Sequence, residues 1–323
     1  MADKSSIEWT NATWNPIRGC TRVSEGCRNC YAERVAARFS QPGDPYEGLA
    51  GWTKSREPRW TGKVITVPLH LKDPLKWKAP RMIFVNSMSD LFHEDLPFDD
   101  VLAIVDVMRQ APQHIYQILT KRPERMREFF TDVWGELAPA NWWLGTSAED
   151  QKTAEARIPA LQNTPATVRW VSLEPLLGPI VLGHDEPELG AVSWLAGIQG
   201  CDPPIPGIDW VVVGGESGPA ARPMHPAWAR SIRDECTQLR TPFFFKQWGE
   251  WAPCELFPPG KYPLHVINSS GTLLQHVLAE PNDRGAEMIC RAGKHLAGRL
   301  LDGREWSEYP EGSPVQLPLS EAH

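Results

Sequence analysis

Three cysteines near the N-terminus have the residue type and the spacing that bind metals. Cys20, Cys27 and Cys30 fall within eleven residues, in the order Cys-x6-Cys-x2-Cys. Closely spaced thiolates bind zinc or iron–sulfur clusters. A helix is expected to begin at Tyr31, and the N-terminus of a helix stabilises thiolates. We therefore expect these three residues to hold a metal centre.

The spacing alone leaves the kind of metal centre open. Three cysteines are one ligand short of a closed zinc site, and a fourth could come from a histidine or from Cys201, Cys236, Cys254 or Cys290. Alternatively the fourth position stays open, which suits an iron–sulfur cluster with one reactive iron. In a reducing compartment an odd number of cysteines indicates metal or redox chemistry, and disulfides are not expected.

The elements that must position this centre repeat one pattern: an apolar run, a polar cluster and an amphipathic helix. The apolar runs are 82–85, 115–119, 142–144, 168–171, 210–213 and 243–245. Continuous apolar runs that alternate with helices are typical of parallel strands covered on both faces. With one strand before the cysteines, they predict an α/β fold, a partial (β/α) TIM-like barrel of about six to seven parallel strands. A doubly wound sheet is the less favoured alternative.

The repeat stops near residue 255, which predicts two parts. Residues 1–255 are expected to form the barrel, with the cysteine loop and with insertions near 41–77 and 182–208. The turn-rich residues 256–323 are expected to form a C-terminal appendage packed on the barrel.

Polar residues directly follow each apolar run. In a parallel barrel such positions gather at one face, and six of them in register predict a binding site there. The candidates for binding a cofactor are Ser87, Ser89, Asp90, Lys121, Arg122, Thr146, Ser147, Glu149, Gly214 and Gly215. The candidates for catalysis are Glu174, Glu216 and Lys246.

Composition and charge restrict the class of protein. Hydrophobic residues make up 41% and charged residues 23%, as in soluble globular enzymes. No apolar run reaches the roughly 18 to 20 residues of a membrane span, and the start has no apolar signal core. We therefore expect a cytoplasmic protein without a membrane partner. A net charge of −7 argues against nonspecific electrostatic binding of nucleic acid, although basic residues cluster around the cysteines.

Longer motifs resemble a known family. They are Ile7–Thr10, Thr13–Pro16, the cysteine loop, Leu119–Pro123, Ser172–Leu176, Gly214–Gly218, Lys246–Gly249 and Gly298–Gly303. Together they resemble a phage- and bacterium-borne three-cysteine-motif family of uncharacterised function. That family is similar to a divergent branch of the radical S-adenosylmethionine superfamily, in the manner of spore photoproduct lyase. The first cysteine gap is six residues here, whereas the superfamily usually has three.

The resemblance implies a 4Fe-4S cluster on the three cysteines and S-adenosylmethionine at the barrel mouth. By position, the methionine amino group is assigned to Ser87, Ser89 and Asp90, and the methionine carboxylate to Lys121 or Arg122. The ribose is assigned to Thr146, Ser147 and Glu149. Glu174 and Glu216 remain for ribose, substrate or proton transfer. The implied reaction is reductive cleavage to a 5′-deoxyadenosyl radical, with a flavodoxin- or ferredoxin-type electron donor.

Three functions follow as hypotheses. The first is a radical enzyme acting on a nucleic acid or nucleotide, which the basic residues beside the cysteines and the many tryptophans motivate. The second is a zinc-stabilised nucleic-acid-binding or interaction protein without turnover. The third, a barrel hydrolase using Asp90, Glu174 and Glu216, leaves the cysteines unexplained and ranks last.

Overall fold

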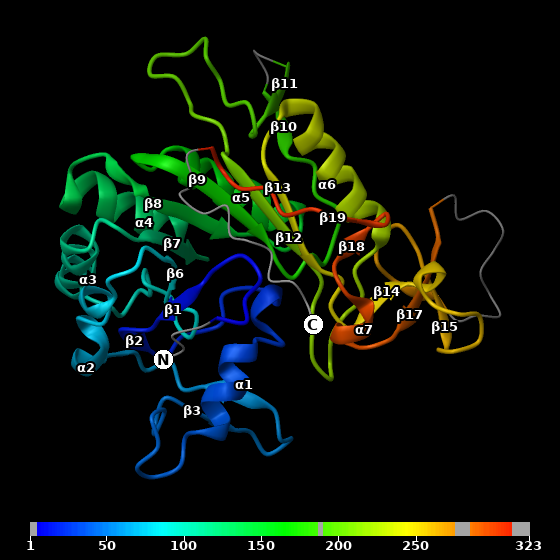
Figure 1. Cartoon of the computed structure of the whole chain (residues 1–323), viewed down its shortest axis with the longest axis horizontal. Helices are drawn as coiled ribbons and strands as arrows, with labels where there is room; N and C mark the ends of the chain where they lie inside the picture. The colour runs from blue at the N-terminus through cyan, green and yellow to red at the C-terminus, as the bar shows by residue number, and fades with distance from the viewer. Residues whose placement is uncertain (1–4, 187–189, 275–284, 312–323) are drawn as a thin grey trace.

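Seven parallel strands form one curled sheet at the centre of the protein (Figure 1). The computed structural model describes residues 5–186, 190–274 and 285–311. The sheet order is β1-β6-β7-β8-β9-β12-β13, so each strand pairs with the strand of this sheet that follows it in the sequence. The strands are β1 (Ala12–Trp14), β6 (Met82–Val85), β7 (Ile115–Thr120), β8 (Ala138–Ser147), β9 (Ala166–Leu173), β12 (Trp210–Gly214) and β13 (Phe243–Gln247). The partial (β/α) barrel predicted from the sequence is confirmed.

Helices in the crossovers cover the outer face of the sheet. They are α3 (Phe98–Gln110), α4 (Pro123–Glu128), which continues into the π-helical turn η3 (Phe129–Trp134), α5 (Gln151–Gln162) and α6 (Pro226–Leu239). Their apolar side chains pack at helical spacing: Val101, Ile104, Val105 and Met108 of α3 are all buried. Because each helix buries one apolar stripe, the strand ends keep fixed positions.

Aromatic side chains fill the inner face of the half-barrel. Trp170 of β9 packs against Trp9, which precedes β1, and against Trp210 of β12, with both pairs of ring centroids 5.2 Å apart. Trp143 of β8 joins them, 5.6 Å from Trp210. Tyr309, near the end of the described chain, stacks on Trp210 at 5.3 Å. These rings form a solid interior beneath the carboxyl ends of the strands.

The long crossover between β1 and β6 carries the cysteine loop. Its elements are β2 (Ile17–Arg18), η1 (Glu25–Cys27), α1 (Tyr31–Arg38), β3 (Ala50–Trp52), β4 (Pro58–Trp60), β5 (Ile65–Thr66), α2 (Pro68–Leu71) and η2 (Pro74–Lys76). Glu33 of α1 is fully buried; its carboxylate pairs with Arg22 and accepts a hydrogen bond from the N–H of Trp60 at 2.8 Å. This pair joins the loop, α1 and the β3–β4 hairpin into one unit.

A small hairpin and an antiparallel sheet complete the described chain. The hairpin is β10 (Gly183–Glu186) with β11 (Gly190–Ser193). The second sheet has the order β14-β17-β15-β16, from β14 (Trp251–Pro253), β15 (Leu264–Ile267), β16 (Leu273–Leu274) and β17 (Glu287–Arg291). The remaining elements are η4 (Cys254–Leu256), α7 (Lys294–Ala297), β18 (Leu300–Leu301) and β19 (Arg304–Glu305). The expected insertion and appendage also include 187–189, 275–284 and 312–323, which lie outside the described residues.

One disulfide corrects the expectation that the cysteines stay unpaired. Cys254 and Cys290 are bonded, because Cys254 directly follows β14 and Cys290 lies on the neighbouring strand β17, with their Cα atoms 5.1 Å apart. Both are therefore excluded as a fourth metal ligand. The free thiols are those of Cys20, Cys27, Cys30, Cys201 and Cys236.

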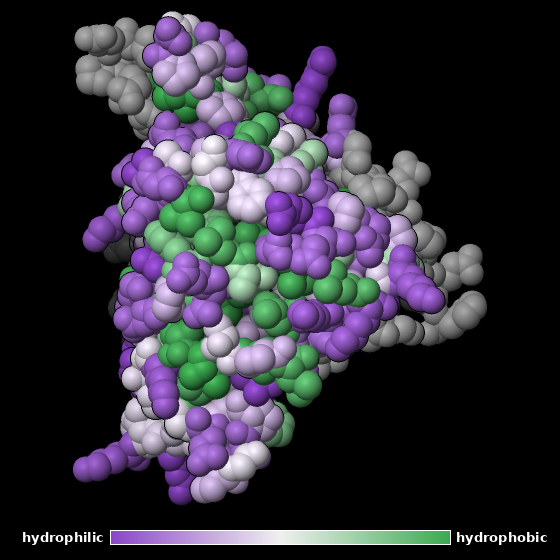
Figure 2. Space-filling model, turned by 90° about the vertical axis from the view of Figure 1, so that its left-hand side faces the viewer, coloured by the Kyte–Doolittle hydropathy of each residue, from purple (hydrophilic) through white to green (hydrophobic). Residues whose placement is uncertain are grey.

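The outer surface mixes apolar and hydrophilic side chains. Figure 2 shows several apolar patches, each bordered by hydrophilic residues. Leu69 of α2 is 78% exposed and Leu137 is 62% exposed. Apolar atoms normally contribute about 55–60% of a folded surface, so such residues need no functional explanation. Within the described chain, no helix has both the length and the apolar character needed to cross a membrane.

Candidate functional site

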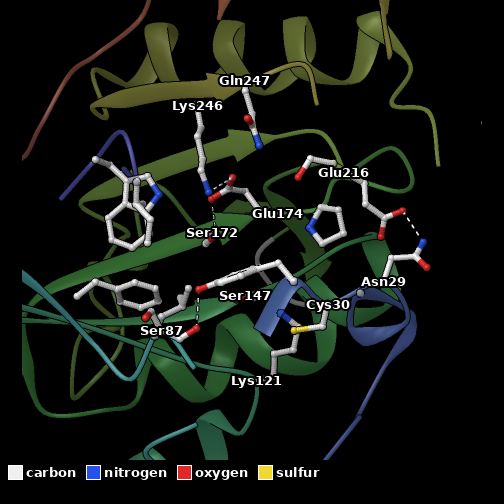
Figure 3. Close-up of a pocket in the computed structure, with 18 of the residues that line it drawn as sticks. Asn29, Cys30, Ser87, Lys121, Ser147, Ser172, Glu174, Glu216, Lys246 and Gln247 are labelled. Carbon is white, nitrogen blue, oxygen red and sulfur yellow. Dashed lines mark hydrogen bonds and ion pairs between the residues drawn. The ribbon is translucent and has the colours of Figure 1, made fainter. Parts of the chain in front are cut away.

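A cavity of about 260 Å³ opens at the carboxyl ends of the barrel strands (Figure 3). The residues predicted from the sequence that line it are Cys30, Ser87, Ser89, Lys121, Ser147, Glu174, Gly215, Glu216 and Lys246. They come from the ends of six strands and from the cysteine loop. The structure brings them together because the carboxyl ends of parallel strands meet at one edge.

The other predicted residues do not line the cavity: Cys20, Cys27, Asp90, Arg122, Thr146, Glu149 and Gly214. Asp90 shows why. One carboxylate oxygen accepts from the Thr120 hydroxyl at 2.7 Å, and the other from the Lys121 N–H at 3.1 Å and from Arg122 at 3.0 Å. Protein donors therefore bond both oxygens of the carboxylate, and the contact of Asp90 with a ligand amino group stays a prediction.

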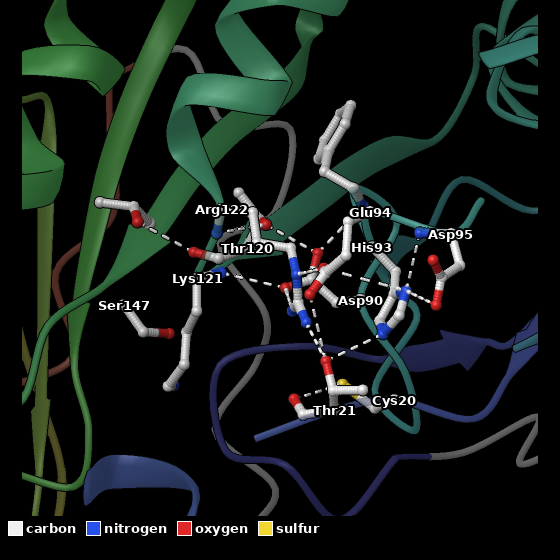
Figure 4. A network of polar contacts seen from close by, with 12 residues as sticks. Cys20, Thr21, Asp90, His93, Glu94, Asp95, Thr120, Lys121, Arg122 and Ser147 are labelled. Carbon is white, nitrogen blue, oxygen red and sulfur yellow. Dashed lines mark hydrogen bonds and ion pairs between the residues drawn. The ribbon is translucent and has the colours of Figure 1, made fainter. Parts of the chain in front are cut away.

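Arg122 joins the end of β7 to the cysteine loop (Figure 4). Its guanidinium pairs with Asp90 and Glu94 and donates a hydrogen bond to the hydroxyl of Thr21, the residue after Cys20, at 2.6 Å. His93 reaches the same hydroxyl through Nε2 at 3.0 Å. Burial and the nearby Arg122 lower the pKa of His93, which favours the neutral ring. Arg122 is thus a structural link and not a free ligand for a carboxylate.

Glu149 joins the end of β8 to the same loop. Its carboxylate is fully buried, accepts from the backbone N–H of Gly26 at 3.2 Å and pairs with Arg157 at 3.0 Å. Thr146 is also fully buried and donates its hydroxyl to the carbonyl of Thr120 at 2.9 Å. Both side chains are bonded inside the protein and lie outside the cavity lining, and their ribose contacts stay a prediction.

Glu216 joins the end of β12 to the loop. Its carboxylate accepts from Asn29 at 2.9 Å and from Arg222 at 2.7 Å, and Arg222 also donates to the carbonyl of Glu25 at 2.9 Å. Burial acts to raise the pKa of Glu216, but the hydrogen bonds from Arg222 and Asn29 outweigh it and hold the pKa below its usual range. The cysteine loop is thus fastened to three strand ends.

The three thiols lie in this fastened loop and influence one another. Burial and the Asp90 carboxylate raise the pKa of Cys20 to about 12, and the other two thiols add to the rise. Burial also raises the pKa of Cys30, which is opposed by the N–H groups of Glu33 and Ala32 at the start of α1. Without a cation these two thiols are therefore held neutral, whereas a bound metal deprotonates coordinating thiols.

As the side chains stand, no three Cys, His, Asp or Glu residues in the described chain are grouped closely enough to hold a metal ion. The meeting of the three thiols at one centre therefore stays a prediction. Their chemistry fits a soft metal or an iron–sulfur cluster, since all three are free and partly buried. Cys20 and Cys30 also pack against the same apolar cluster around α1.

Two lysines, Lys121 and Lys246, line the cavity. Lys246 pairs with Glu174 at 3.0 Å, and the Ser172 hydroxyl donates to the same carboxylate at 3.2 Å. Among the residues that the structure describes, the Lys121 ammonium has no ion pair. Lys121 is consequently suited to an anionic group, and the Glu174–Lys246 pair to proton transfer.

Several lining residues were missed by the sequence analysis. Trp9 and Phe84 form an apolar wall, Asn29 lies in the cysteine loop and Asn86 directly follows β6. Asn86 carried a signal, because it is the first polar residue after an apolar run. Trp9 carried none, since it precedes the first strand and enters the interior only through the tertiary fold.

The fold and the site define an α/β half-barrel protein whose cysteine loop is fastened beside a cavity at the carboxyl edge of the sheet. The chain belongs to the family described as a protein of unknown function, DUF5131, which matches residues 4–310. No curated protein matches the chain. No solved structure matches it either.

Proposed function

We propose that this protein is a radical S-adenosylmethionine enzyme. The observation that carries the proposal is that Cys30, one of three closely spaced free thiols, lines the same cavity as Lys121, whose ammonium has no ion pair within the described residues. The cavity lies where (β/α) barrels hold their ligands. In this proposal Cys20, Cys27 and Cys30 hold a 4Fe-4S cluster, which when bound would supply the electron that cleaves S-adenosylmethionine to a 5′-deoxyadenosyl radical.

The residues of the cavity would bind and orient the cosubstrate. Lys121 would bind the carboxylate of its methionine part, since it is a cation without a protein partner among the described residues. Ser87, Ser89 and Ser147 line the same cavity and offer hydroxyl groups. The burial of the aromatic interior below the cavity would exclude water from that side.

The acidic residues would have two different roles. Glu174 faces the cavity and shares its charge with Lys246, so this pair would move a proton to or from the substrate. Glu216 would hold the cysteine loop through Asn29 and Arg222. The electron would come from a flavodoxin- or ferredoxin-type partner, and a nucleic acid or nucleotide remains the proposed substrate class.

The test is anaerobic purification followed by iron and sulfide analysis. The expected result is brown protein with iron and acid-labile sulfide in equal amounts, which cleaves S-adenosylmethionine to methionine and 5′-deoxyadenosine when reduced. A colourless protein that binds one zinc tightly and cleaves nothing would overturn the proposal. That outcome would favour the zinc-stabilised binding protein.

A further inference from the structure

Three side chains in the cavity lining carry polar atoms that have no hydrogen-bond partner in the described chain. Both amide atoms of Asn86, Oε1 of Gln247 and Nε1 of Trp9 are buried and have no hydrogen-bond partner in the part of the chain that is described. All three residues line the cavity, with exposed fractions of 2%, 7% and 2%. Buried polar groups are normally paired. Unpaired ones that line a cavity therefore indicate where a ligand supplies the partners.

The backbone holds Asn86 in an unusual conformation. Its φ of 61° lies in the left-handed region, which asparagine tolerates better than most residues. Its N–H donates to the carbonyl of Trp14 at 2.8 Å, and its carbonyl accepts from the N–H of Ser89 at 3.3 Å. Such residues cluster at ligand sites, where the surrounding structure maintains the strain. The unpaired amide of Asn86 is thus held at a defined place after β6.

The chemistry of these side chains favours a flat, uncharged ligand. An asparagine amide offers two donors and an acceptor, Gln247 lacks a donor at Oε1, and the Trp9 N–H lacks an acceptor. The rings of Trp9 and Phe84 lie 4.8 Å apart beside them. Lys246 is neutralised by Glu174, so no net charge attracts an anion. A heteroaromatic ring with donors and acceptors along its edge satisfies all these groups.

The two sides of the cavity carry different side chains. Figure 3 shows Lys246 and Gln247 across the cavity from Cys30 and Lys121, with Glu174 between them. The Lys246 ammonium lies 6.0 Å from the ring of Trp9, which places Trp9 on the Lys246 side. Gln247 and Trp9 therefore lie on the side of the cavity away from Lys121, the residue proposed for the methionine carboxylate.

We propose that Trp9, Asn86 and Gln247 bind the nucleobase of the substrate. Nucleobases are read in protein pockets by hydrogen bonds to their edge and by packing against aromatic side chains. The statement that this base belongs to the substrate of a radical reaction rests on the proposed function. The base site itself stands on the unpaired atoms alone.

The experiment is calorimetric titration of the full-length protein with thymidine, uridine, cytidine, guanosine and adenosine, in the presence and absence of S-adenosylmethionine. Ribose is the base-free control, and a short single-stranded oligonucleotide distinguishes a polymer from a free nucleoside. We expect at least one nucleoside other than adenosine to bind while S-adenosylmethionine is present, and ribose not to bind. An oligonucleotide that binds more than tenfold tighter identifies the polymer as the source of the base.

Variants make the test specific. Gln247→Met and Trp9→Phe should each weaken nucleoside binding at least tenfold. Gln247→Met should keep or raise the melting temperature, because it removes a buried atom without a partner. The matched control is Trp142→Phe: its Nε1 is also buried and unpaired, but Trp142 packs in the helix-covered core and does not line the cavity. Trp142→Phe should bind nucleosides as the wild type does.

Several outcomes would overturn the inference: no nucleoside binds, ribose binds equally well, or Trp142→Phe weakens binding as much as Trp9→Phe. Binding of adenosine alone, displaced by S-adenosylmethionine, would assign the site to the cosubstrate and also overturn it. If the protein cleaves S-adenosylmethionine but binds no nucleoside, the base site is refuted and the proposed function stands. If the protein binds nucleosides but takes up no iron, the base site is supported and the proposed radical chemistry is refuted.

Discussion

The buried carboxylate of Glu149 accepts a hydrogen bond from the backbone N–H of Gly26 at 3.2 Å, across 123 residues of sequence. Gly26 lies one residue before Cys27, so the end of β8 directly holds the cysteine loop. A Cβ at Gly26 would lie 3.0 Å from the Glu149 carboxyl carbon, so a side chain there would require the buried carboxylate to shift by a few tenths of an ångström. The position of the thiols therefore depends on a residue that is not itself a ligand.

Glu149→Ala should destabilise the protein strongly. The substitution leaves the buried Arg157 guanidinium without its carboxylate partner and the Gly26 N–H without its acceptor. Removing one partner of a buried ion pair costs about 3–5 kcal/mol of the free energy of unfolding. Denaturant unfolding measures the loss. The control is Glu155→Ala on the exposed side of α5, which should change stability by less than about 0.5 kcal/mol. Equal effects of the two variants would contradict the role of Glu149.

Cys27→Ala should abolish metal binding and leave the barrel folded. The core consists of the strands and helices, so the thiol adds little to it. The measurements are iron content after anaerobic reconstitution and a thermal melt. Cys201→Ala, which removes a free thiol outside the loop, should keep its iron. A large drop in melting temperature together with the loss of one zinc would instead indicate a structural metal, whose binding energy is folding energy.

Alanine at Gly214, the last residue of β12, and at Gly215, which follows it, should have different consequences. A Cβ at Gly214 would lie 2.5 Å from Oε1 of Glu174, the flexible end of a side chain, which can move away. Gly214→Ala should thus fold but displace Glu174 from Lys246 and reduce activity. A Cβ at Gly215 would lie 1.9 Å from the backbone carbonyl of Trp248, which cannot yield. Gly215→Ala should lose about 1–3 kcal/mol or more of stability. Denaturant unfolding of both variants separates these effects.

The stability contribution of Glu216 should depend on pH in a defined direction. Its folded pKa lies below the ordinary value of 4.5 because Arg222 and Asn29 bond the ionised form. A depressed pKa stabilises the fold above the unfolded pKa, and this stabilisation is lost as the pH falls through the folded pKa. The difference in unfolding free energy between wild type and Glu216→Gln should therefore be constant from pH 7 to about pH 5 and shrink below it. A difference that grows on acidification would contradict the assignment.

The sequence predicted the half-barrel because the pattern that specifies it is local. Each apolar run forms a buried strand, and the spacing of Val101, Ile104, Val105 and Met108 predicts one buried helix face. The strand ends followed from the same pattern, so Lys121, Glu174, Glu216 and Lys246 were correctly expected at one edge. These residues lie close together because consecutive strands pair in parallel and their carboxyl ends meet at one edge.

Which of the charged residues remain available to a ligand could not be predicted in this way. Asp90 and Glu149 follow strands as Glu174 does, yet of these three only Glu174 lines the cavity. A hydrogen bond between residues far apart in sequence has no local signal, so Gly26 and Glu149 gave no indication of their contact. The Cys254–Cys290 bond was missed for the same reason, since it depends on the pairing of β14 with β17.

By itself, the sequence determined the α/β half-barrel, the edge at which its polar residues meet and the thiols that belong to one loop. Only the tertiary structure decided that Arg122, Glu149 and Glu216 hold this loop and that Trp9 and Asn86 line a cavity. The physical reason is that the period of apolar residues is set by the backbone geometry of each element. The partner of a buried polar atom is set by which elements pack together, and that is a property of the whole fold.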